Sequence, residues 1–275
     1  MARGVTGPRA LEGSEVITGW NWLVTLGVVV GVLFAAAITL RVWQQLFAWT
    51  AGLDSTSSEF ATYWMPVFWA ELAVLGVVAV LWWGWTGFKK CRLCEAQRAS
   101  VGRVKPGHEL SHIAILWIYT TVGTFSAFMQ FAFFGEQDAT WHQVAIRDTA
   151  LTPSHIPLFY FWFPLLIITT VATFLYGRTR LPHIYRDRGY PLSMLLMIGG
   201  ISSLSFWVAV NEFFHSFWQT EERFSAPLHW GFVIFFYVGG AVIFSIWFQT
   251  LPRMYELIGQ LQVEPGGTGA RGRIP

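Results

Sequence analysis

Long apolar runs alternate with short polar connections along the whole chain. A helix needs about 20 mostly apolar residues to cross the hydrocarbon core of a bilayer. Six runs reach that length, at residues 22–40, 66–85, 113–134, 156–176, 192–210 and 230–250. Trp and Tyr gather near the ends of the runs, as side chains of an interfacial belt do. The pattern predicts an all-α integral membrane protein, a bundle of about six transmembrane helices.

The amino-acid composition narrows the class of protein further. Hydrophobic residues make up 54% of the chain and charged residues 12%, which is far more apolar than an ordinary soluble domain. The net charge of +2, without a basic helix carrying interleaved aromatic residues, gives no indication of a nucleic-acid partner. The two cysteines provide no disulfide framework. The partner that composition indicates is the lipid bilayer.

Lysine and arginine predict the orientation of the chain. Fifteen of them fall in the two termini and in the connections after the second and fourth runs, and three fall in the other connections. Because basic connections stay in the cytoplasm, we expect both termini to be cytoplasmic. The predicted organisation is a cytoplasmic segment at 1–19, a transmembrane domain at 20–252 and a partly disordered cytoplasmic tail at 253–275.

A first group of metal-ligand residues precedes the fourth run. Asp138 and His142 are four positions apart, so on a helix they share one face. His155 follows two positions after Pro153. A carboxylate with two imidazoles suits zinc, copper or iron(II) and leaves room for an exogenous ligand.

A second group nearly repeats this spacing before the sixth run. Asn211 and His215 are four positions apart, and His229 comes two positions after Pro227. Its imidazole-rich set suits copper or zinc. The charge rule places both groups on the outer face, in connections rich in large apolar residues that would exclude water from a metal. We therefore expect two neighbouring metal sites on the extracytoplasmic side.

A third set of candidate ligands is cytoplasmic. Cys91, Cys94, His108 and His112 form a Cys-x2-Cys-x13-His-x3-His pattern, whose spacing is within the range of zinc sites. The alternative is that the two histidines simply cap the third transmembrane helix.

Three other polar residues have structural interpretations. Glu71 lies one turn inside the outer end of the second run, where an ionisable group is costly without a partner. Arg41, at the outer end of the first run, is the expected partner. His183 is expected to be a surface residue of a cytoplasmic connection.

Several longer motifs resemble one family of membrane enzymes. They are Glu136-Gln137-Asp138, Trp141-His142-Gln143, Ile146-Arg147-Asp148-Thr149, Thr152-Pro153-Ser154-His155, Thr179-Arg180-Leu181-Pro182, Asn211-Glu212 with His215, and Ala226-Pro227-Leu228-His229-Trp230-Gly231-Phe232. Together they resemble the C subunit of the copper membrane monooxygenases, which include the particulate methane, ammonia and short-alkane (hydrocarbon) monooxygenases. The resemblance covers the chain from its first to its last predicted helix.

The resemblance implies a function and an assembly. Asp138, His142 and His155 match one copper site of the family, and the catalytic candidates Asn211, His215 and His229 match its neighbour. It also implies the A and B subunits as partners in a trimer of heterotrimers, in a bacterial cell or intracytoplasmic membrane. The implied reaction is hydroxylation of a small apolar substrate by O₂, with electrons from a quinol-linked donor.

One departure from the family pattern bears on the substrate. Phe213 and Phe214 stand where the family usually has a Trp-Gly pair, so the bulk beside a ligand is changed. This favours a short-chain alkane over methane or ammonia. Other functions considered are a scaffold subunit with structural metals, a membrane copper-delivery protein, and a haem protein, which the position of the histidines at helix ends disfavours.

Overall fold

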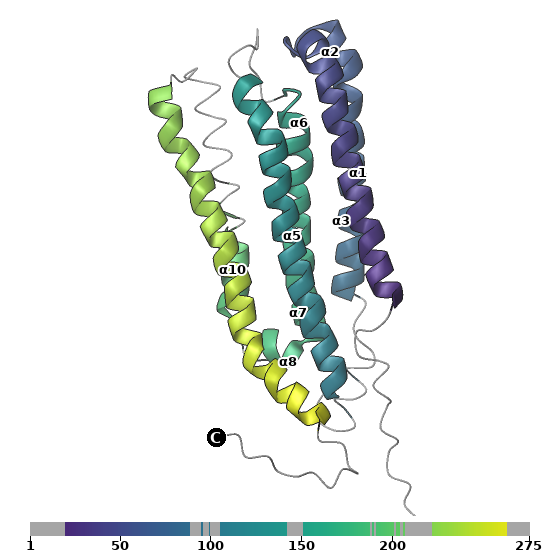
Figure 1. Cartoon of the computed structure of the whole chain (residues 1–275), viewed down its shortest axis with the longest axis vertical. Helices are drawn as coiled ribbons and strands as arrows, with labels where there is room; N and C mark the ends of the chain where they lie inside the picture. Colours follow the sequence, from purple (N-terminus) through teal and green to yellow (C-terminus); the bar gives the residue numbers. More distant parts are fainter. Residues whose placement is uncertain are drawn as a thin grey trace, which may run out of the picture.

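The computed structural model describes residues 20–88, 95, 99, 105–141, 151–187, 189, 191–200, 202–203, 206 and 222–262. This part of the chain is helical apart from short connections. The elements are α1 (Trp20–Ala51), α2 (Ser58–Tyr63), α3 (Met65–Phe88), α5 (Pro106–Trp141), α6 (His155–Pro157), the π-helix η2 (Leu158–Trp162), α7 (Phe163–Arg180), α8 (Pro182–Tyr185) and α10 (Glu222–Gln262). The long helices lie side by side (Figure 1). The prediction of an all-α membrane protein is confirmed.

The helices coincide with the predicted apolar runs. Among the described residues, three helical stretches are long and apolar enough to cross a membrane: Val30–Ala51, Ser58–Phe88 and His155–Arg180. Helices α5 and α10 contain the third and sixth runs, and residues 192–200 form a helix at the start of the fifth. Large apolar side chains such as Val80 and Phe248 remain exposed on the bundle surface, where lipid would surround them.

Helix α1 is longer than its apolar run. The run ends at residue 40, before Arg41, but the helix continues to Ala51. Gln44 is fully buried and its side chain hydrogen-bonds within the protein. Because this polar residue faces protein rather than lipid, it does not end the helix. Residue 40 is therefore not the end of the first helix, and Arg41 belongs to α1 rather than to a connection.

Among the described residues, apolar packing holds the helices together in three clusters. The largest joins α5, α7, α8 and α10 through side chains that include Ile113, Tyr185 and Ile246. In the same region, Trp117 of α5 stacks on Trp247 of α10 with ring centroids 5.3 Å apart, and its indole N–H donates to Thr250 Oγ1 at 2.6 Å. The other two clusters lie around α3, η2 and α6, next to the candidate site.

Arg180 ties the end of α7 to the end of α3. The last carbonyls of a helix have no partner within the helix. The buried guanidinium of Arg180 donates to two of them in α3, the Trp85 O at 3.0 Å and the Thr86 O. The guanidinium also lies over the rings of Trp85 and Tyr176, with centroid distances of 5.1 and 5.2 Å. The cation thus complements the C-terminal dipole of α3.

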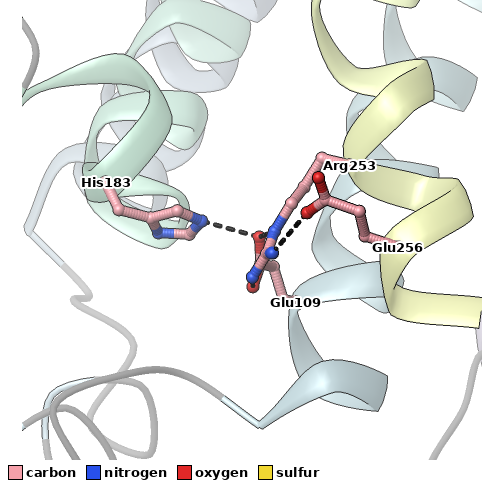
Figure 2. Close-up of polar contacts among 4 residues, drawn as sticks. All are labelled: Glu109, His183, Arg253 and Glu256. Atoms are coloured by element: carbon pink, nitrogen blue, oxygen red, sulfur yellow. Dashed lines mark hydrogen bonds and ion pairs between the residues drawn. The ribbon is translucent and has the colours of Figure 1, made fainter. Parts of the chain in front are cut away.

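A buried ion pair joins α5, α8 and α10 (Figure 2). Glu109, in the first turn of α5, is 2% exposed. Arg253 of α10 donates from Nε to its Oε1 at 2.7 Å and from Nη2 to its Oε2 at 2.8 Å. His183 Nε2 lies 2.8 Å from Glu109 Oε1, so the prediction that His183 is merely a surface residue is wrong.

The protonation of this pair follows from its contacts. Burial by itself would raise the pKa of Glu109, but the hydrogen bonds and charges of Arg253 and His183 outweigh burial and lower the pKa to about 2. The hydrogen bond with Glu109 also raises the pKa of Arg253. The lowered pKa of Glu109 and the raised pKa of Arg253 reflect the same interaction, in which the carboxylate is ionised at neutral pH.

We predict that replacing Glu109 by Gln lowers the thermal stability of the purified protein. Breaking a fully buried pair costs about 3–5 kcal/mol; because Arg253 is 31% exposed, we expect about 1–3 kcal/mol here. A double-mutant cycle with Arg253→Gln, followed by thermal unfolding in detergent, should show a coupling of similar size. Glu256→Gln is the matched control, because Glu256 is 61% exposed and contacts the same arginine. Additive single effects would contradict this account.

Candidate functional site

His155 is the predicted outer-face ligand whose side chain lies among the described residues. It begins α6, and hydroxyl groups hold the turn that precedes it. The backbone N–H of His155 donates to Thr152 Oγ1 at 3.0 Å, and the Thr152 and Ser154 hydroxyl oxygens are 3.1 Å apart. The N–H of Ile156 donates to the Thr152 carbonyl at 3.0 Å. Local hydrogen bonds therefore fix the backbone that carries the imidazole.

The C-terminal end of α1 docks against this turn. Gln44 Nε2 donates to the carbonyl of Pro153 at 2.5 Å. A Cβ placed on Gly52 would lie 2.5 Å from Pro153 Cγ, closer than real Cβ contacts come. Only a glycine at position 52 therefore lets the chain approach Pro153 this closely. Residues far apart in sequence thus position His155.

The imidazole of His155 lies in an apolar environment. The residue is 2% exposed, and its ring packs edge-on against Phe159 with centroids 4.8 Å apart. The next residue, Ile156, packs with Phe60 and Trp64. Residues Leu158–Trp162 form a π-helix, a wide turn that is frequently found at functional sites. Such an apolar shell limits water around the imidazole.

Asp138 occupies the last turn of α5, which ends at Trp141. Four residues earlier on the same face, Phe134 is fully buried and shares a cluster with Leu158 and Trp162 of η2. Position 138 is one turn further along this face. In Figure 1, the C-terminal end of α5 and α6 lie at the same end of the bundle. His142 lies outside the described residues.

The second predicted group is described only in part. Position 229 is in the second turn of α10, which begins at Glu222. The N-terminal end of α10 lies at the same end of the bundle as α6 (Figure 1). Asn211 and His215 lie outside the described residues. The structure thus brings three helix ends with predicted ligand positions to one end of the bundle, and the two metal sites stay predictions.

His108 and His112, two of the candidate zinc ligands, lie at the opposite end of the bundle (Figure 1). His108 and His112, in the first turns of α5, have Nε2 atoms 3.2 Å apart, and His112 Nδ1 lies 2.7 Å from the Tyr176 hydroxyl. Cys91 and Cys94 lie outside the described residues. In the part of the chain that the structure describes, no group of three or more His, Cys, Asp and Glu residues could hold a metal ion. The zinc site therefore stays a prediction.

The expected ion pair between Glu71 and Arg41 is wrong. Glu71 is 6% exposed, and among the described residues neither of its carboxyl oxygens has a hydrogen-bond partner. Arg41 Nη1 instead lies 3.3 Å from Gln44 Oε1, on its own helix. The two side chains face different surroundings: Arg41 reaches Gln44 on its own helix, whereas Phe68 and Leu75, one turn on either side of Glu71, pack with η2.

The fold and the buried histidine define a multi-helix membrane protein with predicted ligand positions at the ends of its helices. The sequence matches, over residues 10–261, a family model described as the C subunit of ammonia monooxygenase/methane monooxygenase. The chain belongs to this family, which confirms the resemblance inferred from its motifs. It is therefore a membrane subunit of a monooxygenase complex. A comparison with curated proteins gave no match.

We predict that Gly52→Ala displaces the turn that carries His155. The added methyl group would meet Pro153 and the Ala48 carbonyl, which is 2.7 Å from it, so the turn must shift at a cost of about 1–3 kcal/mol. Thermal unfolding and retention of the subunit in the purified complex would measure the effect. Gly31→Ala, on the same helix, is the control, since its added Cβ has nothing within 4 Å. Equal behaviour of the two variants would show that the close contact is unimportant.

Proposed function

We propose that this chain is a copper-binding subunit of a membrane monooxygenase that hydroxylates a small apolar substrate with O₂. Family membership over residues 10–261 is the observation that carries the proposal. In this proposal Asp138, His142 and His155 hold one copper ion, and Asn211, His215 and His229 hold the other. When bound, copper would pass electrons to O₂ and activate it toward the substrate.

The described residues fit such a role. An imidazole such as that of His155 is a preferred copper ligand, and its burial against Phe159 gives it a dry, shaped setting. Hydrogen bonds at Thr152 and the contact of Pro153 with α1 hold the ligand backbone in place. A rigid support of this kind is what ligands need to keep one geometry through turnover.

The chemistry at the second group is assigned to Asn211, His215 and His229. We propose that this group lies next to the substrate, because the bulky Phe213 and Phe214 flank its ligands in the sequence. These rings would shape an apolar space and keep water away from the reacting atoms. We favour a short-chain alkane as the substrate, with methane and ammonia as the alternatives.

Partner subunits and an electron donor would complete the proposed enzyme. We propose the A and B subunits as partners in a trimer of heterotrimers, and a quinol-linked donor as the source of electrons. The membrane would be a bacterial cell or intracytoplasmic membrane, with the copper groups on the extracytoplasmic side. The alternative is a scaffold subunit whose metals are structural.

We predict that His215→Ala and His229→Ala lower both copper content and turnover of the intact complex. Loss of supporting residues alone costs about 10–100-fold in many metal sites, so losing a ligand should reduce turnover by more than about 100-fold. Metal analysis, electron paramagnetic resonance and product formation from ammonia, methane, ethane and butane would be measured together. His183→Gln is the control, since His183 lies at the opposite end of the bundle. Full turnover in a copper-depleted variant would favour the scaffold alternative.

We also propose that Cys91, Cys94, His108 and His112 bind zinc. The Nε2 atoms of His108 and His112 lie 3.2 Å apart, within hydrogen-bond distance, so two of the four candidate ligands are side by side. Tyr176, next to His112 Nδ1, would then orient the ring.

Zinc analysis of the intact complex tests this second site. We predict one bound zinc per chain that is lost in His112→Ala, together with unchanged copper at the other end of the bundle. Loss of zinc in Cys91→Ser as well would show that the Cys91 thiolate is also a ligand. Retention of zinc in that variant would show that other donors complete the site with the two histidines. A wild-type complex without zinc would show that the histidines only hydrogen-bond to each other.

A further inference from the structure

Glu71 is a carboxyl group buried inside a membrane-spanning helix. It is 6% exposed and lies within the candidate span Ser58–Phe88. Among the described residues, neither of its oxygens accepts or donates a hydrogen bond. An unpaired carboxylate is costly in such surroundings, so ionisable residues within spans usually serve a function. The fold itself gives Glu71 no structural partner in the part of the chain that is described.

Glu71 lies on the face of α3 that packs on the segment following His155. Phe68, one turn before it, contacts the Tyr160 ring of η2 with centroids 5.1 Å apart. Leu75, one turn after it, shares a cluster with Leu158 and Trp162. Residues three and four apart on a helix are neighbours on one surface. Glu71 is therefore placed between these two contacts, at the level of α6 and η2.

Two other polar groups on this interface are buried without hydrogen-bond partners among the described residues. They are the indole N–H groups of Trp64, between α2 and α3, and of Trp162 in η2. Trp64 packs with Ile156, the neighbour of His155, and Trp162 packs with Leu75. Leucine or phenylalanine at these positions would avoid the cost of burying unpaired polar atoms. Packing alone thus does not explain the polar groups on this interface.

The reaction that we assign to the group of Asn211, His215 and His229 consumes protons. Hydroxylation of one C–H bond takes one O₂, two electrons and two protons, and releases one water molecule. The electrons come from the quinol-class donor. On the side of the neighbouring group the protons must cross apolar surroundings, because its described ligand His155 is 2% exposed and packed against Phe159. A protonatable group on the same interface would meet this need.

We propose that Glu71 carries protons to the two neighbouring copper groups predicted at the outer end of the bundle. This proposal rests on the proposed function. In the resting protein the carboxyl group is neutral. Its O–H bond breaks when the proton passes to an oxygen atom of O₂ that is being reduced to water, directly or through water molecules. The remaining carboxylate then takes a proton from water at the outer end of the bundle. Glu71 returns to the neutral acid without gaining or losing electrons.

The variant Glu71→Gln separates this role from packing. A neutral acid and an amide have nearly the same size, so the variant should fold, assemble and bind copper like the wild type. Because the amide cannot release a proton, we expect turnover of the intact complex to fall at least about tenfold, with a larger solvent deuterium isotope effect. Glu71→Asp, which restores a carboxyl group, should recover part of the turnover. Glu59→Gln is the control, since Glu59 is exposed in the same span.

Two results would overturn the proposal. One is turnover of Glu71→Gln within about twofold of the wild type at equal copper content. The other is a loss of turnover in Glu71→Gln that accompanies loss of copper or of assembly and that Glu71→Asp does not restore. That result would show that Glu71 has a structural role.

A spectroscopic measurement is independent of turnover. Infrared spectra of the wild type should contain the carbonyl band of a neutral carboxylic acid that shifts in D₂O and is missing in Glu71→Gln. Absence of this band would contradict the proposal whatever the activity. Normal turnover in His215→Ala would instead remove the proposed function, so the two failures are distinguishable.

Discussion

The cost of an unpaired polar group in apolar surroundings governs this structure. A bilayer offers backbone N–H and C=O groups no water, so the spanning segments must be helices that satisfy these groups internally. The same cost decides where helix ends lie. Arg180 donates to the terminal carbonyls of α3, and Thr152 accepts the backbone N–H of His155. These contacts allow helices to end inside the protein next to other helices.

Two ends of the bundle use polar groups in different ways. At one end, Glu109, Arg253 and His183 satisfy one another and join three helices. At the other end, His155 is held by backbone hydrogen bonds and an apolar shell, and Glu71 lies without a hydrogen-bond partner among the described residues. The first arrangement stabilises the bundle. The second places ionisable side chains in apolar surroundings, which is the arrangement expected of a functional site.

The family motifs acquire physical reasons in this fold. In Thr152-Pro153-Ser154-His155, the threonine fixes the backbone of the histidine and the proline packs on Gly52. In Thr179-Arg180-Leu181-Pro182, the arginine closes the end of α3. Each motif therefore connects a local turn to a helix that is distant in the sequence, in addition to any role in binding a metal.

The sequence by itself determined the fold class, the approximate helices and the family, because apolar length and residue spacing are local properties. It also singled out His155, since a histidine two positions after a proline and directly before an apolar run occurs twice. Tertiary structure alone decided that α1 continues past Arg41 and that Glu71 does not pair with it. It also decided that His183 binds Glu109. Such pairings join residues that are distant in the sequence, and no local pattern encodes which side chains helix packing brings together.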